Sequence, residues 1–444
     1  MALMLDIETP TTQSSSRLLS LLSPEQIGPK LVGQFCLPFD PRQSCEIQST
    51  RQPPPFLRKQ RDPMTVTKEQ VLAQLSTIND PDLNRDIVSL GFITKAAVCD
   101  GLVDVVINLT TPACPVKDQL KQEAIDKITA LDGVTEVKVE MTAEVRGTQE
   151  KREIAKGIKH IVAVSSGKGG VGKSTTTVNL ACALAATGAK VGILDCDVYG
   201  PDIPMMLGMS GQPDQDGRKL VPKERHGVKT MSIGYLLDEE KPVIWRGPMV
   251  HKLIEQFLGD VVWGELDYLL VDMPPGTGDA QLSLAQLVPL SGAVLVTTPQ
   301  AVSTFDVGKA IGMFKQVKVE ILGILENMAG YTVTGQVAGA TSETTLELDL
   351  GDRKETITTD AEGRFETIAH VFGQGGAARL AQRHSFPVLG SIPLNPSVRV
   401  GGDAGDPIVA SEPDSPLARA FTEAAGRVAQ RLAIREHAEL PILQ

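Results

Sequence analysis

The chain contains no apolar run that approaches the roughly 20 residues a membrane-spanning helix needs. Its formal net charge of −11 leaves no excess of basic residues for a surface that coats nucleic acid, although a local phosphate site is compatible with that charge. With 444 residues and 42% hydrophobic content, the chain can form two or three domains around large cores. We therefore expect a soluble globular protein that uses neither a membrane nor nucleic acid as a partner.

Cysteine and histidine are few and scattered. No C-x-x-C pair occurs, and the cysteine spacing is not that of a disulfide scaffold, so we expect a reducing, cytoplasmic environment. The six histidines show no H-x₃-H pairing, so a zinc site is not expected. The six cysteines are Cys36, Cys45, Cys99, Cys114, Cys182 and Cys196.

Residues 167–174 read G-K-G-G-V-G-K-S and fit the phosphate-binding pattern G-x-x-x-x-G-K-[ST]. The motif lies between an expected strand at 160–165 and an expected helix at 174–186, so backbone N–H groups would surround phosphate oxygens. Lys173 would reach the β- and γ-phosphates, and the Ser174 hydroxyl would bind Mg²⁺. The predicted nucleotide-contacting residues here are Gly167, Lys168, Gly169, Gly170, Val171, Gly172, Lys173, Ser174 and Thr175.

Acidic residues follow two other expected strands. The strand at 191–195 leads into Asp195-Cys196-Asp197, and the strand at 268–272 ends in Asp272. Carboxylates at strand ends beside phosphates can bind Mg²⁺ or position the attacking water, and Asp272 is predicted to belong to the Mg²⁺ shell. The segment 274–279 (P-P-G-T-G-D) is stiff and then flexible, as expected of a switch that senses the γ-phosphate.

A second lysine, Lys168, lies inside the loop, where an ordinary phosphate loop does not need one. The pattern K-G-G-x-G-K-[ST] resembles the deviant Walker A motif of the MinD/ParA/nitrogenase-iron-protein class. The resemblance implies an ATP-sandwich homodimer in which Lys168 crosses to the partner's nucleotide, and it assigns water activation to Asp197. A solvated Lys168 and a helix-capping Asp197 are the alternatives. By the same resemblance Asn327 reads the adenine edge, with Pro393 on the far side of the base.

The chain is expected to divide into a tail, a small unit and a large unit. Residues 1–63 show no sustained periodicity and are expected to be a disordered tail or a mis-annotated start, with translation beginning at Met1 or Met64. Residues 64–147 form an α/β unit, and 148–159 a charged linker. From 160 to 436, buried strands alternate with helices, which predicts an α/β fold with a doubly wound, mostly parallel sheet. Residues 332–369 interrupt it as a β-rich insert.

Further motifs resemble the Mrp/ApbC family of iron–sulfur cluster carrier ATPases. They are D-V-Y-G-P-D-I-P (197–204), W-R-G-P-M (245–249), V-D-M-P-P-G-T-G-D (271–279), T-T-P-Q (297–300), E-N-M-A-G (326–330), F-G-Q-G-G (372–376) and I-P-L-N-P (392–396). The segment 64–147 resembles the PaaD-like domain often fused to these carriers, through D-P-D-L (80–83), I-V-S-L-G (87–91) and L-T-T-P-A-C-P (109–115). The resemblance implies slow, switch-type ATP hydrolysis and cluster transfer from a scaffold protein to apoprotein clients.

One element of the family pattern is missing. In the family a C-x-x-C usually follows the E-N-M segment, so that a dimer can bridge one cluster, but residues 331–335 read Y-T-V-T-G. Iron–sulfur clusters need thiolate ligands, usually four, and neither threonine nor valine replaces them. Carrier activity must therefore use other ligands or has been lost.

Cys114 is the candidate ligand that remains. It precedes Pro115, which suits the first position of a helix expected over about 115–131, so Cys114 is predicted to be the N-cap. Helix N-termini favour the thiolate and lower its pKa, and the PaaD-like resemblance also points to a reactive or metal-binding Cys114. An inert buried cysteine is the alternative.

The leading hypothesis is an ATPase that delivers iron–sulfur clusters, with ATP and Mg²⁺ as its nucleotide and metal. The alternative is a MinD/ParA-like positioning ATPase, which uses the same dimer switch on a membrane or on DNA. Such proteins need a basic amphipathic tail or face, whereas the last helix mixes charges on its polar side and is predicted to dock on the core. An ATP switch without a cluster is the other alternative, and an electron-transfer ATPase is disfavoured because it also needs bridging cysteines. The apolar positions of the last helix are Leu417, Phe421, Ala425, Val428 and Leu432.

Overall fold

The computed structural model describes residues 66–81, 83–99, 101–145, 155–236, 247–340, 343–351 and 353–439. The expectations for the tail at 1–63, for the start at Met64, for most of the linker and for Trp245 and Arg246 concern residues outside this part of the chain. No helix among the described residues is long and apolar enough to cross a membrane.

The N-terminal α/β region is a three-stranded sheet with two helices. Helix α1 (Lys68–Leu75) begins at a capping box, in which the Thr67 hydroxyl accepts from the Gln70 N–H and the Gln70 side chain accepts from the Thr67 N–H. Strands β3 (Ile93–Cys99) and β4 (Leu102–Leu109) form an antiparallel pair, and β5 (Glu136–Ala143) joins β4 in parallel after helix α2 (Lys117–Thr129). Alternate β4 residues are buried with apolar residues of both helices, which fixes the strand register.

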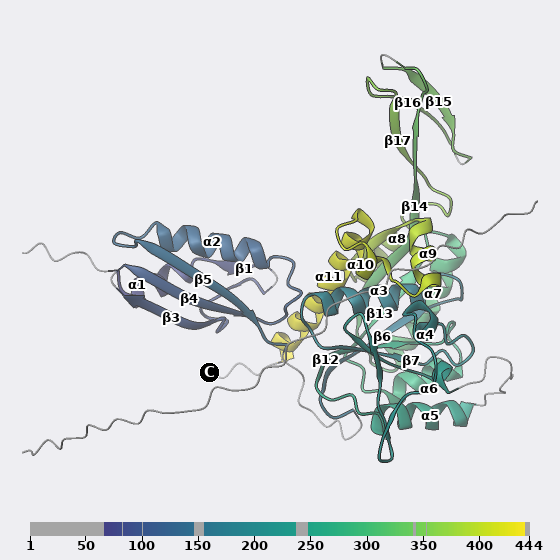
Figure 1. The fold of residues 1–444 in the computed structure, drawn as a ribbon, viewed down its shortest axis with the longest axis horizontal. Coiled ribbons are helices and arrows are strands. Elements are labelled where there is room, and N and C mark those ends of the chain that lie inside the picture. The colour runs from purple at the N-terminus through teal and green to yellow at the C-terminus, as the bar shows by residue number, and fades with distance from the viewer. Residues whose placement is uncertain are drawn as a thin grey trace, which may run out of the picture. The chain divides into compact units, whose positions relative to one another are not determined.

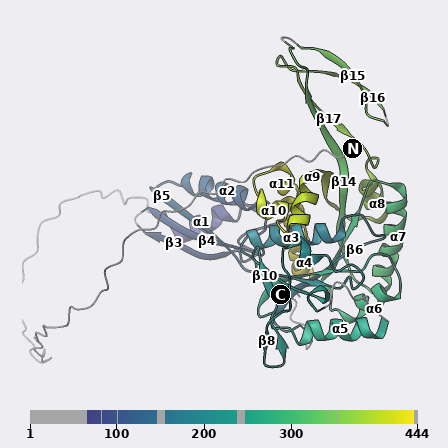
Figure 2. The ribbon, with the colours of Figure 1, turned by 45° about the vertical axis from the view of Figure 1, so that its right-hand side comes forward.

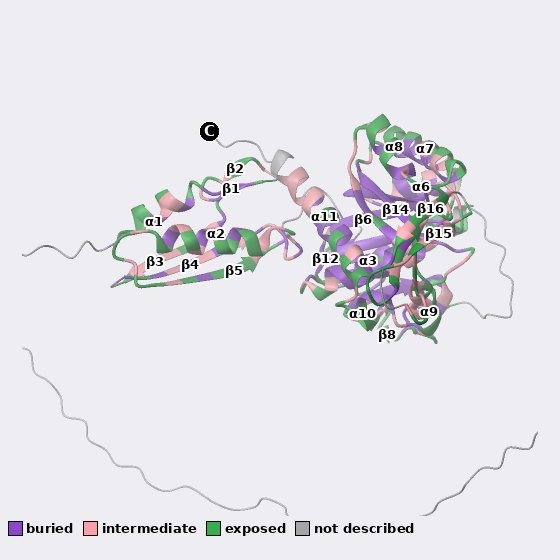
Figure 3. Ribbon diagram, turned by 90° about the horizontal axis from the view of Figure 1, so that it is seen from above, coloured by how far each residue is buried: buried purple, intermediate pink, exposed green. Residues whose placement is uncertain are grey.

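The second region contains a nine-stranded, mostly parallel sheet in the order β10-β11-β7-β12-β6-β13-β14-β17, with β18 also paired to β14 (Figure 1). The central strands are buried on both faces and read as continuous apolar runs, as parallel strands do (Figure 3). The parallel strands are β6 (Ile158–Ser166), β7 (Val191–Asp195), β11 (Val228–Ser232), β12 (Leu266–Asp272), β13 (Gly292–Thr297), β14 (Ile321–Gln336) and β18 (Val388–Leu394).

Helices cover both faces of this sheet, so the predicted doubly wound fold is confirmed. One apolar core contains α3 (Lys173–Ala186) and α11 (Pro416–Glu439), and the other contains α5 (Gly247–Gly259), α6 (Asp279–Leu287) and α7 (Ala301–Gln316). The remaining elements are β1 (Asn79–Asp80), β2 (Arg85–Asp86), α4 (Ile203–Met206), β8 (Gln215–Asp216), β9 (Lys219–Leu220), β10 (Lys223–Arg225), η1 (Ile233–Tyr235), β15 (Thr345–Asp349), β16 (Lys354–Thr358), β17 (Arg364–Ala369), α8 (Gly376–His384), α9 (Pro396–Ala404) and α10 (Ile408–Ser411).

Strand β14 runs much further than the predicted strand at 321–325. Met328 takes a positive φ of 56°, which marks an irregularity between the parallel part of the strand and its extension. Residues 331–336 then pair antiparallel with β17, and β15 pairs with β16, so the predicted β-rich insert is built on an extension of the main sheet (Figure 2).

Helix α11 docks on the core as predicted. Its five predicted apolar positions are all buried, and α11 packs against α3 and β18. This apolar face is used inside the protein, so it is not the free amphipathic surface that a membrane-binding tail requires.

We expect Phe421→Ala to lower the free energy of unfolding by about 3–5 kcal/mol, because Phe421 is fully buried on α11 and its loss leaves a cavity. Phe305→Ala is the matched control, since the Phe305 side chain is 68% exposed. Urea unfolding followed by tryptophan fluorescence measures both variants. Equal effects of the two substitutions would contradict the docking of α11.

Candidate nucleotide site

The phosphate-binding loop joins β6 to α3 and depends on glycine at two close approaches. A Cβ at Gly167 would lie 2.2 Å from the backbone carbon of Asp306 on α7, so no side chain fits. Gly172 has a φ of 81°, and a Cβ there would lie 2.2 Å from Nδ2 of Asn327. These contacts explain why the loop needs glycine at both positions.

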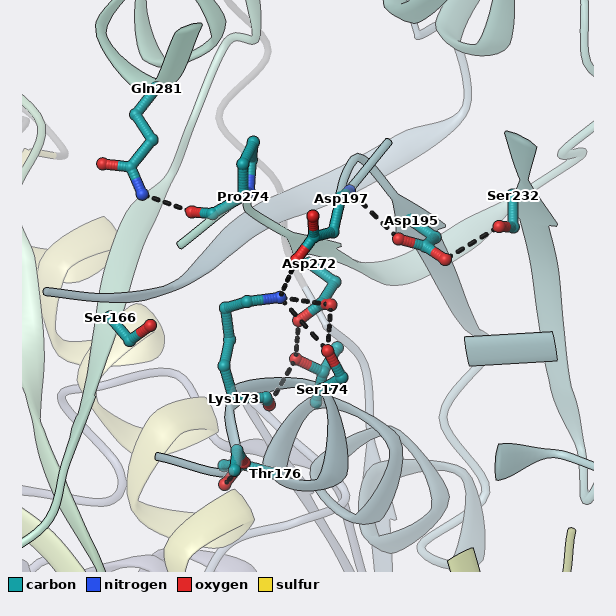
Figure 4. Close-up of polar contacts among 12 residues, drawn as sticks. Ser166, Lys173, Ser174, Thr176, Asp195, Asp197, Ser232, Asp272, Pro274 and Gln281 are labelled. Carbon is teal, nitrogen blue, oxygen red and sulfur yellow. Dashed lines mark hydrogen bonds and ion pairs between the residues drawn. The ribbon is translucent and has the colours of Figure 1, made fainter. Parts of the chain in front are cut away.

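Lys173 lies in a buried cluster at the start of α3 (Figure 4). Its Nζ donates to Asp272 Oδ2 at 2.5 Å and lies 3.5 Å from Asp197 Oδ2. The Ser174 hydroxyl donates to Asp272 Oδ2 at 2.7 Å, and the Thr177 hydroxyl donates to Asp272 Oδ1 at 2.6 Å. Burial disfavours the charged ammonium, yet the carboxylates of Asp272, Asp197 and Asp195 together outweigh burial and hold the pKa of Lys173 above its ordinary value. The structure therefore brings Lys173, Ser174, Asp197 and Asp272 together, as the sequence predicts.

Three adjacent parallel strands place polar side chains in one row at the carboxyl edge of the sheet. Asp195 of β7 is in register with Asp272 of β12 on one side and with Ser232 of β11 on the other. Asp195 is buried, its Oδ2 accepts from the Ser232 hydroxyl at 2.7 Å, and its Oδ1 accepts from the Asp197 N–H at 3.1 Å. Burial, together with the Asp272 carboxylate, raises the pKa of Asp195 well above its ordinary value.

Asp197 is buried at the edge of the same row. Its Oδ1 has no hydrogen-bond donor among the described residues. Burial raises the pKa of Asp197, and the Lys173 ammonium opposes that rise. A buried carboxylate oxygen without a donor can receive a hydrogen bond from a bound water.

The donors beside Lys173 suit a magnesium ion. Ser174 Oγ and the Asp272 carboxylate are hard oxygen ligands, which Mg²⁺ prefers, and Mg²⁺ usually adds water and phosphate oxygens to one or two protein ligands. In the described part of the chain, no three His, Cys, Asp or Glu side chains are grouped so that they could hold a metal ion by themselves. The residues therefore fit Mg²⁺ only in combination with a phosphate ligand.

A cavity of about 260 Å³ adjoins the loop at the predicted base position. Asn327 Nδ2 donates to the Val171 carbonyl at 2.9 Å, so this side chain also fastens the loop to β14. The Asn395 side chain instead accepts from the Ser397 N–H and caps α9. The cavity is lined by Gly172, Thr175, Met206, Asn327, Met328, Pro393, Leu394, Asn395, Val398, Arg399, Gly402 and Asp403.

Lys168 is half-buried in the loop, and its carbonyl accepts from the Ser166 hydroxyl at 2.9 Å. That hydrogen bond involves the backbone of Lys168 and does not constrain its side chain. Its predicted role across a dimer concerns a second chain and stays a prediction.

The prediction that Cys114 caps a helix is wrong. The N-cap of α2 is Val116, and the Lys117 N–H donates to the Cys114 carbonyl at 3.3 Å. Pro115 therefore lies in a turn before the helix, where its fixed φ is equally suitable. Cys114 is half-buried and packs against the core of the N-terminal region, and the helix-capping argument for a thiolate does not apply to it.

The other described cysteines divide by burial. Cys99 is exposed, whereas Cys182 and Cys196 are buried in the two cores. Burial raises the pKa of Cys182 to about 12, so this thiol is an inert core residue.

Three site residues were not found from the sequence. Thr177 completes the hydrogen bonding of Asp272, Ser232 bonds to Asp195, and the Gln281 side chain donates to the Pro274 carbonyl. Thr177 lies one helical turn after Ser174 and could have been found from that spacing. Ser232 belongs to no motif, and only the strand order brings it to Asp195.

We expect the free energy of unfolding to fall less with rising pH in Asp195→Asn than in the wild type. A carboxyl whose pKa is higher in the folded chain binds more protons when folded, so the free energy of unfolding falls as pH rises from the unfolded pKa, about 4, through the folded pKa. Asparagine removes this titration and keeps an oxygen for the Asp197 N–H. Thermal midpoints at pH 5 and pH 8 measure the effect, with the exposed Asp216→Asn as control. If the thermal midpoints of Asp195→Asn and wild type change equally between pH 5 and pH 8, the raised pKa of Asp195 is refuted.

The amino-acid sequence matches two known protein families. Residues 157–343 and 359–429 match the ParA family described as NUBPL iron-transfer P-loop NTPase, and residues 68–140 match the iron–sulfur cluster assembly protein family. The chain is 43% identical over 377 residues to the iron–sulfur cluster carrier protein of Synechocystis, covering 83% of this chain and 99% of the relative. It is 38% identical over 369 residues to that of Escherichia coli K12, covering 82% and 92%.

A solved structure is also similar. The nucleotide-binding protein of Archaeoglobus fulgidus in complex with ADP is 37% identical, with a TM-score of 0.46, covering 60% of this chain and 93% of that one. The family matches and the relatives' identity and coverage show that the chain belongs to the iron–sulfur cluster carrier family of ParA-type P-loop NTPases.

Proposed function

We propose that this chain is an ATP-hydrolysing carrier that transfers iron–sulfur clusters from a scaffold protein to apoprotein clients. The observation that carries the proposal is the buried cluster of Lys173, Ser174, Asp197 and Asp272 beside a loop with the second lysine, in a chain of this family. We also propose a cytoplasmic homodimer and the division into units at 64–147 and 160–436.

ATP binding would begin at the loop. Backbone N–H groups of the loop and of the N-terminus of α3 bind the phosphates, and Lys173 turns from Asp272 toward the β- and γ-phosphates. The base enters the cavity between Asn327 and Pro393. Mg²⁺, when bound by Ser174 and Asp272, would supply charge neutralisation at the phosphates.

Hydrolysis would use Asp197 to position the attacking water through Oδ1, the oxygen without a donor. Lys168 from the partner subunit would stabilise charge that develops on the phosphates. Because two subunits must meet before the site is complete, hydrolysis is slow and acts as a switch. ATP binding closes the dimer, and hydrolysis reopens it.

The cargo would be held without the family's C-x-x-C. Of the described cysteines, Cys182 and Cys196 are buried, Cys99 is exposed and Cys114 is half-buried. We propose Cys114 as a cluster ligand, because it lies in the segment that resembles the PaaD-like pattern. Cys114 from each of two subunits gives two thiolates, and a cluster usually has four ligands, so further ligands are needed besides Cys114.

The two loop lysines are expected to behave differently. Lys173→Ala should abolish ATP binding, because Lys173 holds the phosphates of its own subunit. Lys168→Ala should preserve binding and slow hydrolysis by about 10²–10³-fold, the usual effect of removing one charge-stabilising donor. Fluorescent-nucleotide titration and phosphate release measure the two properties, with exposed Lys219→Ala as control. Equal loss of ATP binding in both variants would refute the role of Lys168 across the dimer.

Anaerobic reconstitution with iron and sulfide tests the carrier role. We expect the wild type to take up a cluster and Cys114→Ala to lose it, as measured by visible absorbance and iron content. Exposed Cys99→Ala is the matched control and should retain the cluster. If neither wild type nor variant binds a cluster, the chain is an ATP switch without cargo.

A further inference from the structure

The segment that carries Asp197 is held at two places. At its start, the Asp197 N–H donates to Asp195 Oδ1 at 3.1 Å. Further along, residues 201–204 pack against the η1 turn, where a Cβ at Gly234 would lie 3.1 Å from the Pro201 carbonyl oxygen and 3.2 Å from Pro204 Cγ. The position of Asp197 therefore depends on Asp195 and on η1 together.

Ser232 connects these two supports. Its hydroxyl donates to Asp195 Oδ2 at 2.7 Å, and the same oxygen accepts from the Gly234 N–H at 3.0 Å. Ser232 is fully buried, ends β11, and is the N-cap of η1. A small residue with one donor and at least one acceptor is required here, because the site offers an acceptor on one side and a donor on the other.

We propose that Ser232 is a positioning residue for ATP hydrolysis. The hydrogen bonds of its hydroxyl within the described part of the chain go to Asp195 and Gly234, not to the phosphate-binding loop. It acts by joining Asp195 and η1 into one support for residues 197–204, so that Asp197 Oδ1 is held where the attacking water binds. This inference rests on the proposed role of Asp197 and adds to it a residue from a different strand.

The strand order explains why a residue of β11 supports Asp195 of β7. Ser232 and Asp195 are register partners on adjacent parallel strands, so the hydroxyl reaches the carboxylate without any loop rearrangement. A support built on strands positions a catalytic group more precisely than one built on a loop. Small displacements of a group that orients water are costly, because the reaction needs the water in line with the phosphate.

Ser232→Ala is the direct test. We expect kcat for ATP hydrolysis to fall about tenfold, with KM for ATP and nucleotide affinity within about twofold of wild type, because the loop and the base cavity are untouched. Thr359→Val is the matched control. Thr359 is a buried residue of the insert whose hydroxyl accepts from the Thr344 N–H at 3.0 Å and donates to the Asp360 carbonyl at 3.1 Å, so it bonds to neither Asp195 nor η1. This control should preserve kcat even if it lowers the thermal midpoint.

Two further variants make the result decisive. In an Asp197→Ala background, Ser232→Ala should cause no additional loss of kcat, because its effect passes through Asp197. Gly234→Ala retains serine at 232, but its Cβ would lie 3.1 Å from the Pro201 carbonyl oxygen and 3.2 Å from Ser232 Oγ. It therefore presses on the same support from the η1 side and should lower kcat even where Ser232→Ala fails to fold.

The outcomes separate this inference from the proposed function. If Asp197→Ala is slow but Ser232→Ala and Gly234→Ala keep wild-type kcat, the positioning role of Ser232 is wrong and the role of Asp197 stands. The positioning role is also wrong if Ser232→Ala lowers kcat as much in the Asp197→Ala background as it does in the wild type. If Asp197→Ala itself hydrolyses ATP at the wild-type rate, the proposed role of Asp197 fails, and the role of Ser232 fails with it.

Discussion

The buried ion pair between Lys173 and Asp272 is the interaction on which the nucleotide site depends. Asp195, Asp197 and Asp272 are buried along one sheet edge, and Lys173 is the cation placed among them. Burying charges is costly unless they are paired and hydrogen-bonded, and the hydroxyls of Ser174 and Thr177 complete that bonding. The lysine that is paired with these acids is also the one that we propose to bind the ATP phosphates. If Lys173 turns to the phosphates, Asp272 and Asp197 lose its charge, so the proposed binding step involves the segment that carries Asp197 as well.

Much of the fold could be predicted because buried parallel strands are apolar runs with clear ends. The strand at 191–195 has the predicted bounds, and the apolar spacing of α11 identified its buried face. The helix start near Cys114 could not be predicted, because a proline suits both a turn and the first helical position. Ser232 could not be predicted either. Its role depends on strand order, a long-range property that leaves no local pattern.

The structure explains why the missing C-x-x-C cannot be restored at its usual place. Residues 331–336 form a regular antiparallel ladder with β17, in which Thr332 opposes Ile368 and Gly335 opposes Phe365. Side chains three positions apart in a strand point to opposite faces, so cysteines at 332 and 335 could not bind one metal centre. In this chain the segment is sheet. If the chain carries clusters, the ligands belong elsewhere, and a thiol that is not fully buried, such as that of Cys114, is the kind of group required.

Strand β14 connects the nucleotide loop to both the insert and α8. Asn327 bonds to the Val171 carbonyl of the loop, the neighbouring Glu326 accepts from the Ala377 N–H at 2.8 Å, and the strand continues into the ladder with β17. Met328, between these contacts and the ladder, adopts a positive φ that is uncommon for a bulky side chain and is held by its surroundings. Packed interiors are stiff, so these hydrogen bonds tie the position of the loop to that of α8 through the parallel part of β14, while the break at Met328 separates that part from the ladder of the insert.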